Sequence, residues 1–167
     1  IVCAILAFFW VWMGLVYHIL YFSAINKAAY IFGLVFIAQG IIFLYQGSIK
    51  QKIRLTFALD LRGVIAIVLI VYALVAYPLL GYLMGHVYPR TPTFGVPCPT
   101  TIFTFGVLLF SLNRIPWLIT LIPLLWSAVG FSAALSLSIN EDFGLVLAGI
   151  LFAAMLLTHN PKSQVKI

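Results

Sequence analysis

The fold is decided by an uninterrupted apolar stretch that reads Val64-Ile-Ala-Ile-Val-Leu-Ile-Val-Tyr-Ala-Leu-Val-Ala-Tyr-Pro-Leu-Leu-Gly-Tyr-Leu-Met84. It carries no charged side chain, and about 20 consecutive apolar residues are enough for a helix to cross the hydrocarbon core of a bilayer. In lipid every backbone polar group must be satisfied internally, which a helix achieves and an isolated strand does not. The stretch therefore predicts a transmembrane helix.

The rest of the chain has the same character. Hydrophobic residues make up 65% of the 167 residues and charged residues only 7%, whereas roughly 25% of the residues in soluble domains are charged. Five further apolar segments can be read, at residues 1–20, 30–45, 101–112, 116–137 and 143–158. We therefore predict a single all-α domain over residues 1–167, a polytopic bundle of about six membrane-spanning helices.

The basic residues indicate how this bundle is oriented. The formal net charge is +6, but the basic side chains stand between apolar runs rather than on one face, so no nucleic acid partner is expected. If all six segments cross, seven Lys and Arg fall on one side and only Lys27 and Arg90 on the other. If the short segment 101–112 dips in and returns instead, this bias disappears. We expect six crossings, with the seven basic residues and the C-terminus in the cytoplasm.

Two connecting segments differ in composition. Residues 47–62 are basic and amphipathic, and we expect a cytoplasmic interfacial helix there rather than a strand, whose edges would be unpaired at a membrane surface. Residues 85–100 hold four of the eight prolines. Proline fixes φ and lacks an N–H group, so this segment is predicted to be a stiff loop on the outer face.

Several short motifs carry a resemblance to a known family. They are Trp12–His18 (WMGLVYH), Phe22–Asn26 (FSAIN), Tyr77–Gly81 (YPLLG), Gly85–Pro89 (GHVYP), Pro97–Thr104 (PCPTTIFT) and the pair Glu141-Asp142. With them the chain resembles an uncharacterised family of bacterial multi-pass membrane proteins, catalogued as domain of unknown function 6064. The resemblance implies a polytopic membrane protein with a further helix upstream of Ile1, which would make seven crossings with the N-terminus outside. It implies no activity. We expect this protein in the cell inner membrane.

Under the favoured topology, most side chains able to do chemistry gather at the outer ends of the helices. This candidate outer-face cluster consists of His18, Asn26, His86, Tyr88, Cys98, Glu141 and Asp142. Imidazole, thiolate and carboxylate are ligand types for zinc and copper, so one alternative is a metal site built from His18, His86, Cys98 and Glu141. The spacing matches no metal motif. Histidines hydrogen-bonded to loop carbonyls are the favoured interpretation, and the cofactor stays unknown.

Helix capping offers a second interpretation of several of these residues. Thr100 and Thr101 precede an apolar run and are expected to cap its free N–H groups, although the same helix end could hold an anion. Glu141 and Asp142 complement the positive end of the next helix, or attract a cation. Cys98 has no second cysteine near it in sequence, so a structural thiol is favoured over a nucleophile.

Three classes of function remain open for such a chain. No serine-histidine-acid arrangement, phosphate loop or dinucleotide fingerprint is present, so an enzyme of a soluble type is disfavoured. The first class is a structural or accessory subunit that packs against lipid, pigments or other membrane subunits. The second is a small transporter or channel, against which the absence of charge in the middle of the apolar segments counts. The third is a membrane-embedded protein that binds a metal or cofactor.

Overall fold

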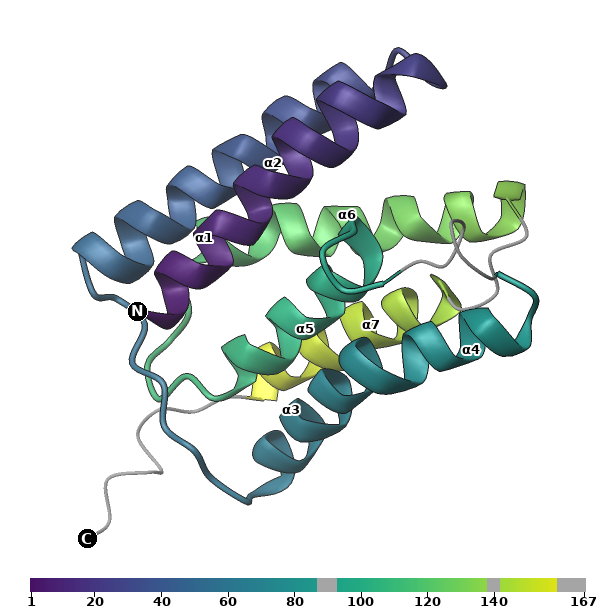
Figure 1. Ribbon diagram of the computed structural model, residues 1–167. Helices are drawn as coiled ribbons and strands as arrows, with labels where there is room; N and C mark the ends of the chain where they lie inside the picture. Colours follow the sequence, from purple (N-terminus) through teal and green to yellow (C-terminus); the bar gives the residue numbers. More distant parts are fainter. Residues whose placement is uncertain (87–92, 138–141, 159–167) are drawn as a thin grey trace, which may run out of the picture.

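Helices make up most of the described part of the chain. The computed structural model (Figure 1) describes residues 1–86, 93–137 and 142–158, and for residues 131–137 it describes the backbone only. These residues form six helical runs and no strand. The prediction of an all-α fold is therefore confirmed.

The first three helical runs each contain a π-helical part. They are Val2–Ala24, built from α1 (Val2–Trp12), η1 (Met13–Tyr21) and η2 (Phe22–Ala24); Ala29–Ile49, built from α2 (Ala29–Ile42) and η3 (Phe43–Ile49); and Leu61–Leu83, built from α3 (Leu61–Val71), η4 (Tyr72–Ala76) and α4 (Tyr77–Leu83). With 23, 21 and 23 residues, they are long and apolar enough to cross a membrane by length and composition.

The last three helical runs are α5 (Pro97–Leu109), α6 (Trp117–Leu137) and α7 (Phe143–Thr158). The bounds of α7 agree with the predicted segment at both ends. By contrast α5 begins four residues before the predicted start at Thr101, because Pro97 already has the backbone angle of a first helical turn.

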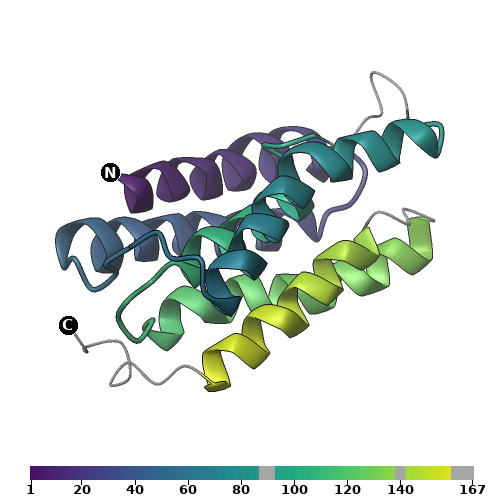
Figure 2. The same cartoon turned by 90° about the horizontal axis from the view of Figure 1, so that it is seen from below.

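The helices run back and forth between the two ends of the bundle (Figures 1 and 2). The starts of α1, α3 and α6 lie at one end, together with the last turns of η3, α5 and α7. The start of α5 departs from this pattern. It lies in the middle of the bundle rather than at the far end (Figure 1). The chain therefore traverses the bundle six times, and the traverse made by α5 is the short one.

The helix α5 can be short because protein surrounds it. Eleven of its 13 residues are buried, and its neighbours are α3, α6, α7 and η4. Phe105 of α5 stacks on Phe152 of α7 with ring centroids 4.6 Å apart. A helix of this length covers about 20 Å, less than the roughly 30 Å of a hydrocarbon core. The irregular backbone that leads into α5 would then lie within the hydrocarbon core of a membrane, where it is tolerated only if protein surrounds it.

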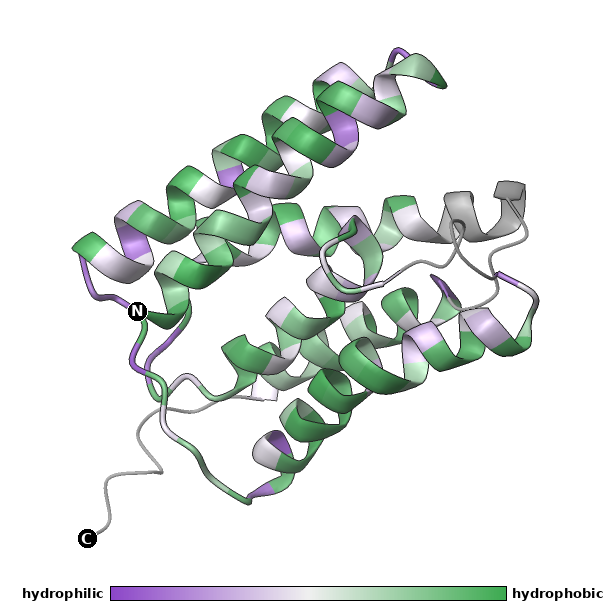
Figure 3. Cartoon of the chain, in the orientation of Figure 1, coloured by the Kyte–Doolittle hydropathy of each residue, from purple (hydrophilic) through white to green (hydrophobic). Residues whose placement is uncertain are grey.

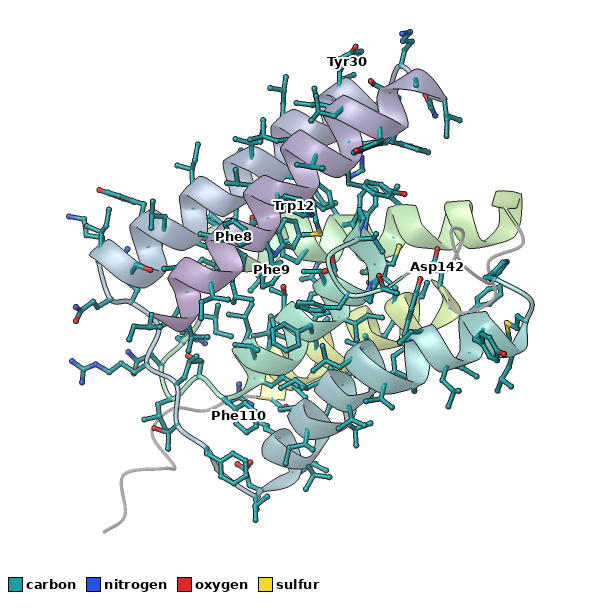
Figure 4. All side chains as sticks on the ribbon, in the orientation of Figure 1. Phe8, Phe9, Trp12, Tyr30, Phe110 and Asp142 are labelled. Atoms are coloured by element: carbon teal, nitrogen blue, oxygen red, sulfur yellow. The ribbon has the colours of Figure 1, made fainter. Side chains whose placement is uncertain are left out.

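Hydrophobic residues dominate the helices, and hydrophilic residues stand mostly at the connections and helix ends (Figure 3). Large apolar side chains are exposed along the helices, whereas several polar side chains are buried between them. Phe8 and Trp12 on the outward side of α1 are 61% and 45% exposed (Figure 4). Gln39 on α2 and Thr104 on α5 are fully buried. This arrangement is the reverse of that in a water-soluble domain. It is compatible with a lipid environment.

Glycines allow the helices to approach each other at the level of the backbone. A Cβ atom on Gly14 of η1 would lie 2.6 Å from the Gly33 carbonyl oxygen of α2. In the same way, a Cβ atom on Gly106 of α5 would lie 2.8 Å from the Ala66 carbonyl oxygen of α3. Small residues at helix interfaces are typical of packing in membranes, where close van der Waals contact drives association.

The expected interfacial helix over residues 47–62 is wrong. Residues 51–59 form no helix, and Leu55 forms an isolated antiparallel bridge with Ser111. The Thr56 N–H donates to the Phe110 carbonyl at 2.9 Å, and the Leu112 N–H donates to the Arg54 carbonyl at 2.8 Å. The argument against an extended segment assumed that its edge would be unpaired, but the residues that follow α5 supply the partner.

The described end of the 85–100 segment turns into the bundle. Phe94 packs between Phe9 of α1, with ring centroids 4.8 Å apart, and Phe103 of α5, at 5.0 Å. Residues 87–92 lie outside the described part of the chain. The described residues before α5 therefore reach inward, between α1 and α5.

Candidate functional site

The first turn of α5 packs Cys98, a half-buried side chain, against the core of the bundle. Gly95 adopts a positive φ of 102°, a conformation that glycine reaches without strain. Its N–H group donates to the Thr100 hydroxyl at 3.0 Å. Pro97 then begins the helix after an extended Val96. This local sequence turns the chain sharply and fixes the direction in which α5 starts.

Asp142 is a buried carboxylate next to this turn. It is 3% exposed and immediately precedes α7 (Figure 4). The Tyr77 hydroxyl, from the first residue of α4, donates a hydrogen bond to it. A carboxylate taken out of water needs such donors, and the positive end of a helix dipole also favours a negative charge at this position.

Cys98 completes a group of three side chains, from α4, α5 and the residue before α7, which we call the inner polar cluster (Tyr77, Cys98 and Asp142). The Cys98 thiol lies within hydrogen-bonding range of Asp142 and Tyr77. Trp126 of α6 lies against the same thiol. The cluster can exchange hydrogen bonds among a hydroxyl, a thiol and a carboxylate; Tyr77 and Asp142 are buried and Cys98 is half-buried.

His18 lies beside this cluster, inside η1, and is fully buried. Aromatic rings surround it, and we call this group the aromatic cage: Tyr17, Phe22, Phe32, Phe36 and Trp126. The closest ring centroid is that of Phe36, at 4.7 Å. Among the residues that the structure describes, neither imidazole nitrogen has a hydrogen-bond partner.

Two aromatic side chains join the cage to the inner polar cluster. The Trp126 ring lies 5.3 Å from the His18 ring, centroid to centroid, and also borders Cys98. Tyr17 contacts His18, with ring centroids 5.0 Å apart, and lies near Cys98 and Asp142. Tyr17 and His18 both lie in a π-helical turn, a rare conformation that often occurs at functional sites.

The structure brings some members of the predicted outer-face cluster together and separates others. Cys98 and Asp142 meet, and His18 lies on the other side of Trp126 from Cys98. Asn26 is exposed beyond the end of η2, where its side chain accepts a hydrogen bond from the Ala28 N–H at 2.9 Å. His86 follows α4 and is partly exposed. Tyr88 and Glu141 lie outside the described residues.

Thr100 and Thr101 were expected to cap the helix, but neither occupies the cap position in the structure. Both residues lie inside α5, and the N-cap position belongs to Val96, which has no capping side chain. The Thr101 hydroxyl instead donates to the Pro97 carbonyl at 2.7 Å. The two threonines therefore satisfy polar groups around the buried start of α5 rather than the free N–H groups of its first turn.

In the described part of the chain, no three His, Cys, Asp or Glu side chains are grouped closely enough to hold a metal ion. Sequence reasoning missed Tyr77 and Trp126, although both border Cys98. For Tyr77 a signal existed, because it opens the Tyr77–Gly81 motif. Trp126 stands in an ordinary apolar run with nothing to mark it.

The fold and the site define a class: an all-α protein of apolar helices that surrounds a small buried polar centre. More particularly, the chain belongs to the family of unknown function DUF6064, whose model matches residues 1–166. This confirms the resemblance carried by the motifs. No curated protein and no solved structure matches significantly.

Proposed function

We propose that the protein is a multi-pass integral protein of the inner membrane and serves as a rigid structural or accessory subunit of a larger membrane complex. One observation carries the proposal: inside an apolar bundle, buried polar side chains join helices that are distant in sequence. A polar group in such an interior persists only where it has a partner or a role. Here the partners connect one half of the chain to the other.

Three hydrogen bonds make these connections. The Trp10 indole N–H of α1 donates to the Thr104 hydroxyl of α5 at 3.1 Å. The Gln39 amide of α2 donates to the Ile119 carbonyl of α6 at 2.9 Å. Tyr77 of α4 donates to Asp142 at the start of α7. Interhelical hydrogen bonds in lipid contribute about 0.6 to 2 kcal/mol each. Together they favour one fixed arrangement of helices, which suits a scaffold.

The outward surface supports contact with lipid and with other helices. Large apolar side chains are exposed on every long helical run, for example Leu34 at 64% on α2 and Val68 at 59% on α3. Such side chains meet acyl chains or the apolar faces of neighbouring membrane helices equally well. A subunit of a membrane complex needs a surface of this kind together with a stable interior.

Native mass spectrometry after gentle solubilisation tests the proposal. We expect the protein to leave the membrane in a complex of defined mass with other membrane subunits at fixed stoichiometry. As the detergent concentration is raised stepwise, the other subunits should dissociate in a defined order. Membrane proteins that were only co-solubilised in the same lipid patch would show no such order. A species that contains only this chain and lipid under the gentlest conditions would overturn the accessory role.

A further inference from the structure

An apolar groove lies between α2 and α6, next to the aromatic cage. Its volume is about 170 Å³, and side chains from both helices line it: Phe32, Val35, Phe36, Ile122, Leu125 and Trp126. Val35 and Leu125 are 38% and 57% exposed, so the groove opens at the outward surface of the bundle. In a membrane this opening faces the acyl chains.

The groove and His18 share a wall. Phe32, Phe36 and Trp126 line the groove on one side and contact the imidazole ring on the other, at centroid distances of 5.9, 4.7 and 5.3 Å. These rings separate the groove from the imidazole, so a ligand in the groove reaches His18 only when one of them changes its side-chain rotamer. Behind this wall lies a buried hydrogen-bonding group that has no partner among the described residues.

The depth of His18 limits what can reach it. It lies six residues before the end of the 23-residue run Val2–Ala24, a distance of about 9 Å along the helix. This position is below the level of phospholipid headgroups. The acyl chains at that depth carry no hydrogen-bonding atom. A partner for the imidazole must therefore be a lipid-soluble molecule with a polar atom on an otherwise apolar body.

We propose that the groove between α2 and α6 is a lateral binding site for a lipid-soluble quinone, with His18 as its polar anchor. A quinone ring is flat and stacks on Trp126 or Phe36. Its carbonyl oxygen accepts a hydrogen bond from the imidazole N–H. Its isoprenoid tail extends through the apolar mouth of the groove into the bilayer. This binding role goes beyond the structural role proposed above.

Quenching of tryptophan fluorescence by a short-tailed ubiquinone analogue tests this site, with the purified chain in lipid nanodiscs. We expect saturable quenching that is largely removed by Trp126→Phe. His18→Phe should fill the cage but weaken binding about tenfold, equivalent to about 1.4 kcal/mol. His18→Gln, which keeps an N–H donor, should retain more of the affinity than His18→Phe.

Two matched variants on α2 test the groove itself. Val35→Phe fills the groove and should abolish saturation, whereas Leu34→Phe, on the adjacent exposed position outside the groove, should leave it unchanged. Circular dichroism melting shows whether each variant is folded. Linear, non-saturating quenching that is equal in wild type and Val35→Phe would overturn the site. So would unchanged quinone affinity in a folded His18→Phe, or quenching of Trp126 by brominated phospholipid that the quinone analogue fails to displace, since either result indicates an acyl chain as the occupant.

Discussion

At the scale of single residues, the Tyr77 hydroxyl and the Asp142 carboxylate depend on each other. Both side chains are almost completely buried, at 1% and 3% exposure. A buried group that loses its partner keeps its desolvation penalty, so one deletion is worse than a matched pair of deletions. We predict that Tyr77→Phe lowers the free energy of unfolding by about 1 to 3 kcal/mol. Unfolding of the detergent-solubilised protein, followed by circular dichroism, measures this change.

The control for this prediction lies five residues along the same helix. Tyr82→Phe removes an equivalent hydroxyl from a side chain that is 62% exposed, and it should change the stability by less than about 0.5 kcal/mol. The double variant Tyr77→Phe with Asp142→Asn should cost less than the sum of its two single variants. Strict additivity would show that the two side chains are not coupled.

Residue-scale reasoning from the sequence found part of the site and missed the rest. Cys98 and Asp142 were recognisable because thiols and carboxylates are rare in such an apolar chain. The burial of His18 was not predictable, because a position near the end of a helix suggests an interfacial side chain. The π-helical turn η1 and the packing of α2 and α6 decide its burial, and both depend on tertiary contacts that a pattern of hydrophobicity does not contain.

At the scale of secondary-structure elements, apolar runs bounded by polar residues were sufficient to locate the helices. The segment 143–158 was predicted with its observed bounds. The start of α5 was not, since Pro97 and Pro99 were assigned to a loop although proline is well suited to a first helical turn. The pairing of Leu55 with Ser111 was also out of reach, because it joins segments more than fifty residues apart.

The contact between η1 and α2 yields a prediction for this scale. Gly33→Ala should place a methyl group 2.8 Å from the Gly14 carbonyl oxygen and 2.6 Å from the Ile19 side chain. The backbone oxygen cannot give way cheaply, so the helices must separate, at a cost of about 1 to 3 kcal/mol. Ala38→Leu on the exposed face of the same helix is the control. An unfolding midpoint for Gly33→Ala equal to that of the control would contradict close packing here.

The end of η3 provides a stabilising substitution. Gln51 has a positive φ of 49°, and the following Lys52 N–H donates to the Gln46 carbonyl at 3.0 Å, as at helix ends that favour glycine. Gln51→Gly should relieve the strain and raise stability by about 0.5 to 1 kcal/mol. Lys50→Gly, at a neighbouring position with φ of −80°, should lower stability instead. Thermal melting of the two variants in parallel checks the opposite signs.

At the scale of the whole molecule, the bridge between Leu55 and Ser111 ties together two connections that carry basic residues. The Asn113 side chain also reaches the Lys52 carbonyl, at 3.5 Å. These contacts put the segment that precedes α3 and the segment that follows α5 at one end of the bundle. Arg54 and Arg114 therefore lie at the same end, as six crossings require. A short α5 that returned to its own side would separate them.

The orientation of that end follows from the positive-inside rule. Basic residues accumulate in the short loops that stay in the cytoplasm, and the described residues at this end include Lys50, Lys52, Arg54, Arg62 and Arg114. The opposite end has Lys27 in the turn between η2 and α2. We therefore predict that residues 47–62 and 111–114 face the cytoplasm, while the turn at residues 25–28 faces outward.

Single cysteines at exposed positions test this orientation without removing any basic residue. Thr56→Cys and Asn113→Cys should resist a membrane-impermeant maleimide in intact cells and react after permeabilisation, whereas Ile25→Cys, at a side chain 83% exposed, should react in both conditions. The parent chain measures the background of the native Cys3 and Cys98, of which Cys3 is 6% exposed. Equal reactivity of Asn113→Cys and Ile25→Cys in intact cells, with Thr56→Cys protected, would mean that α5 does not complete a crossing. Reaction of Thr56→Cys and Asn113→Cys with protection of Ile25→Cys would instead keep the six traverses and reverse the orientation, because the bridge between Leu55 and Ser111 holds the first two positions at one end whichever way the bundle faces.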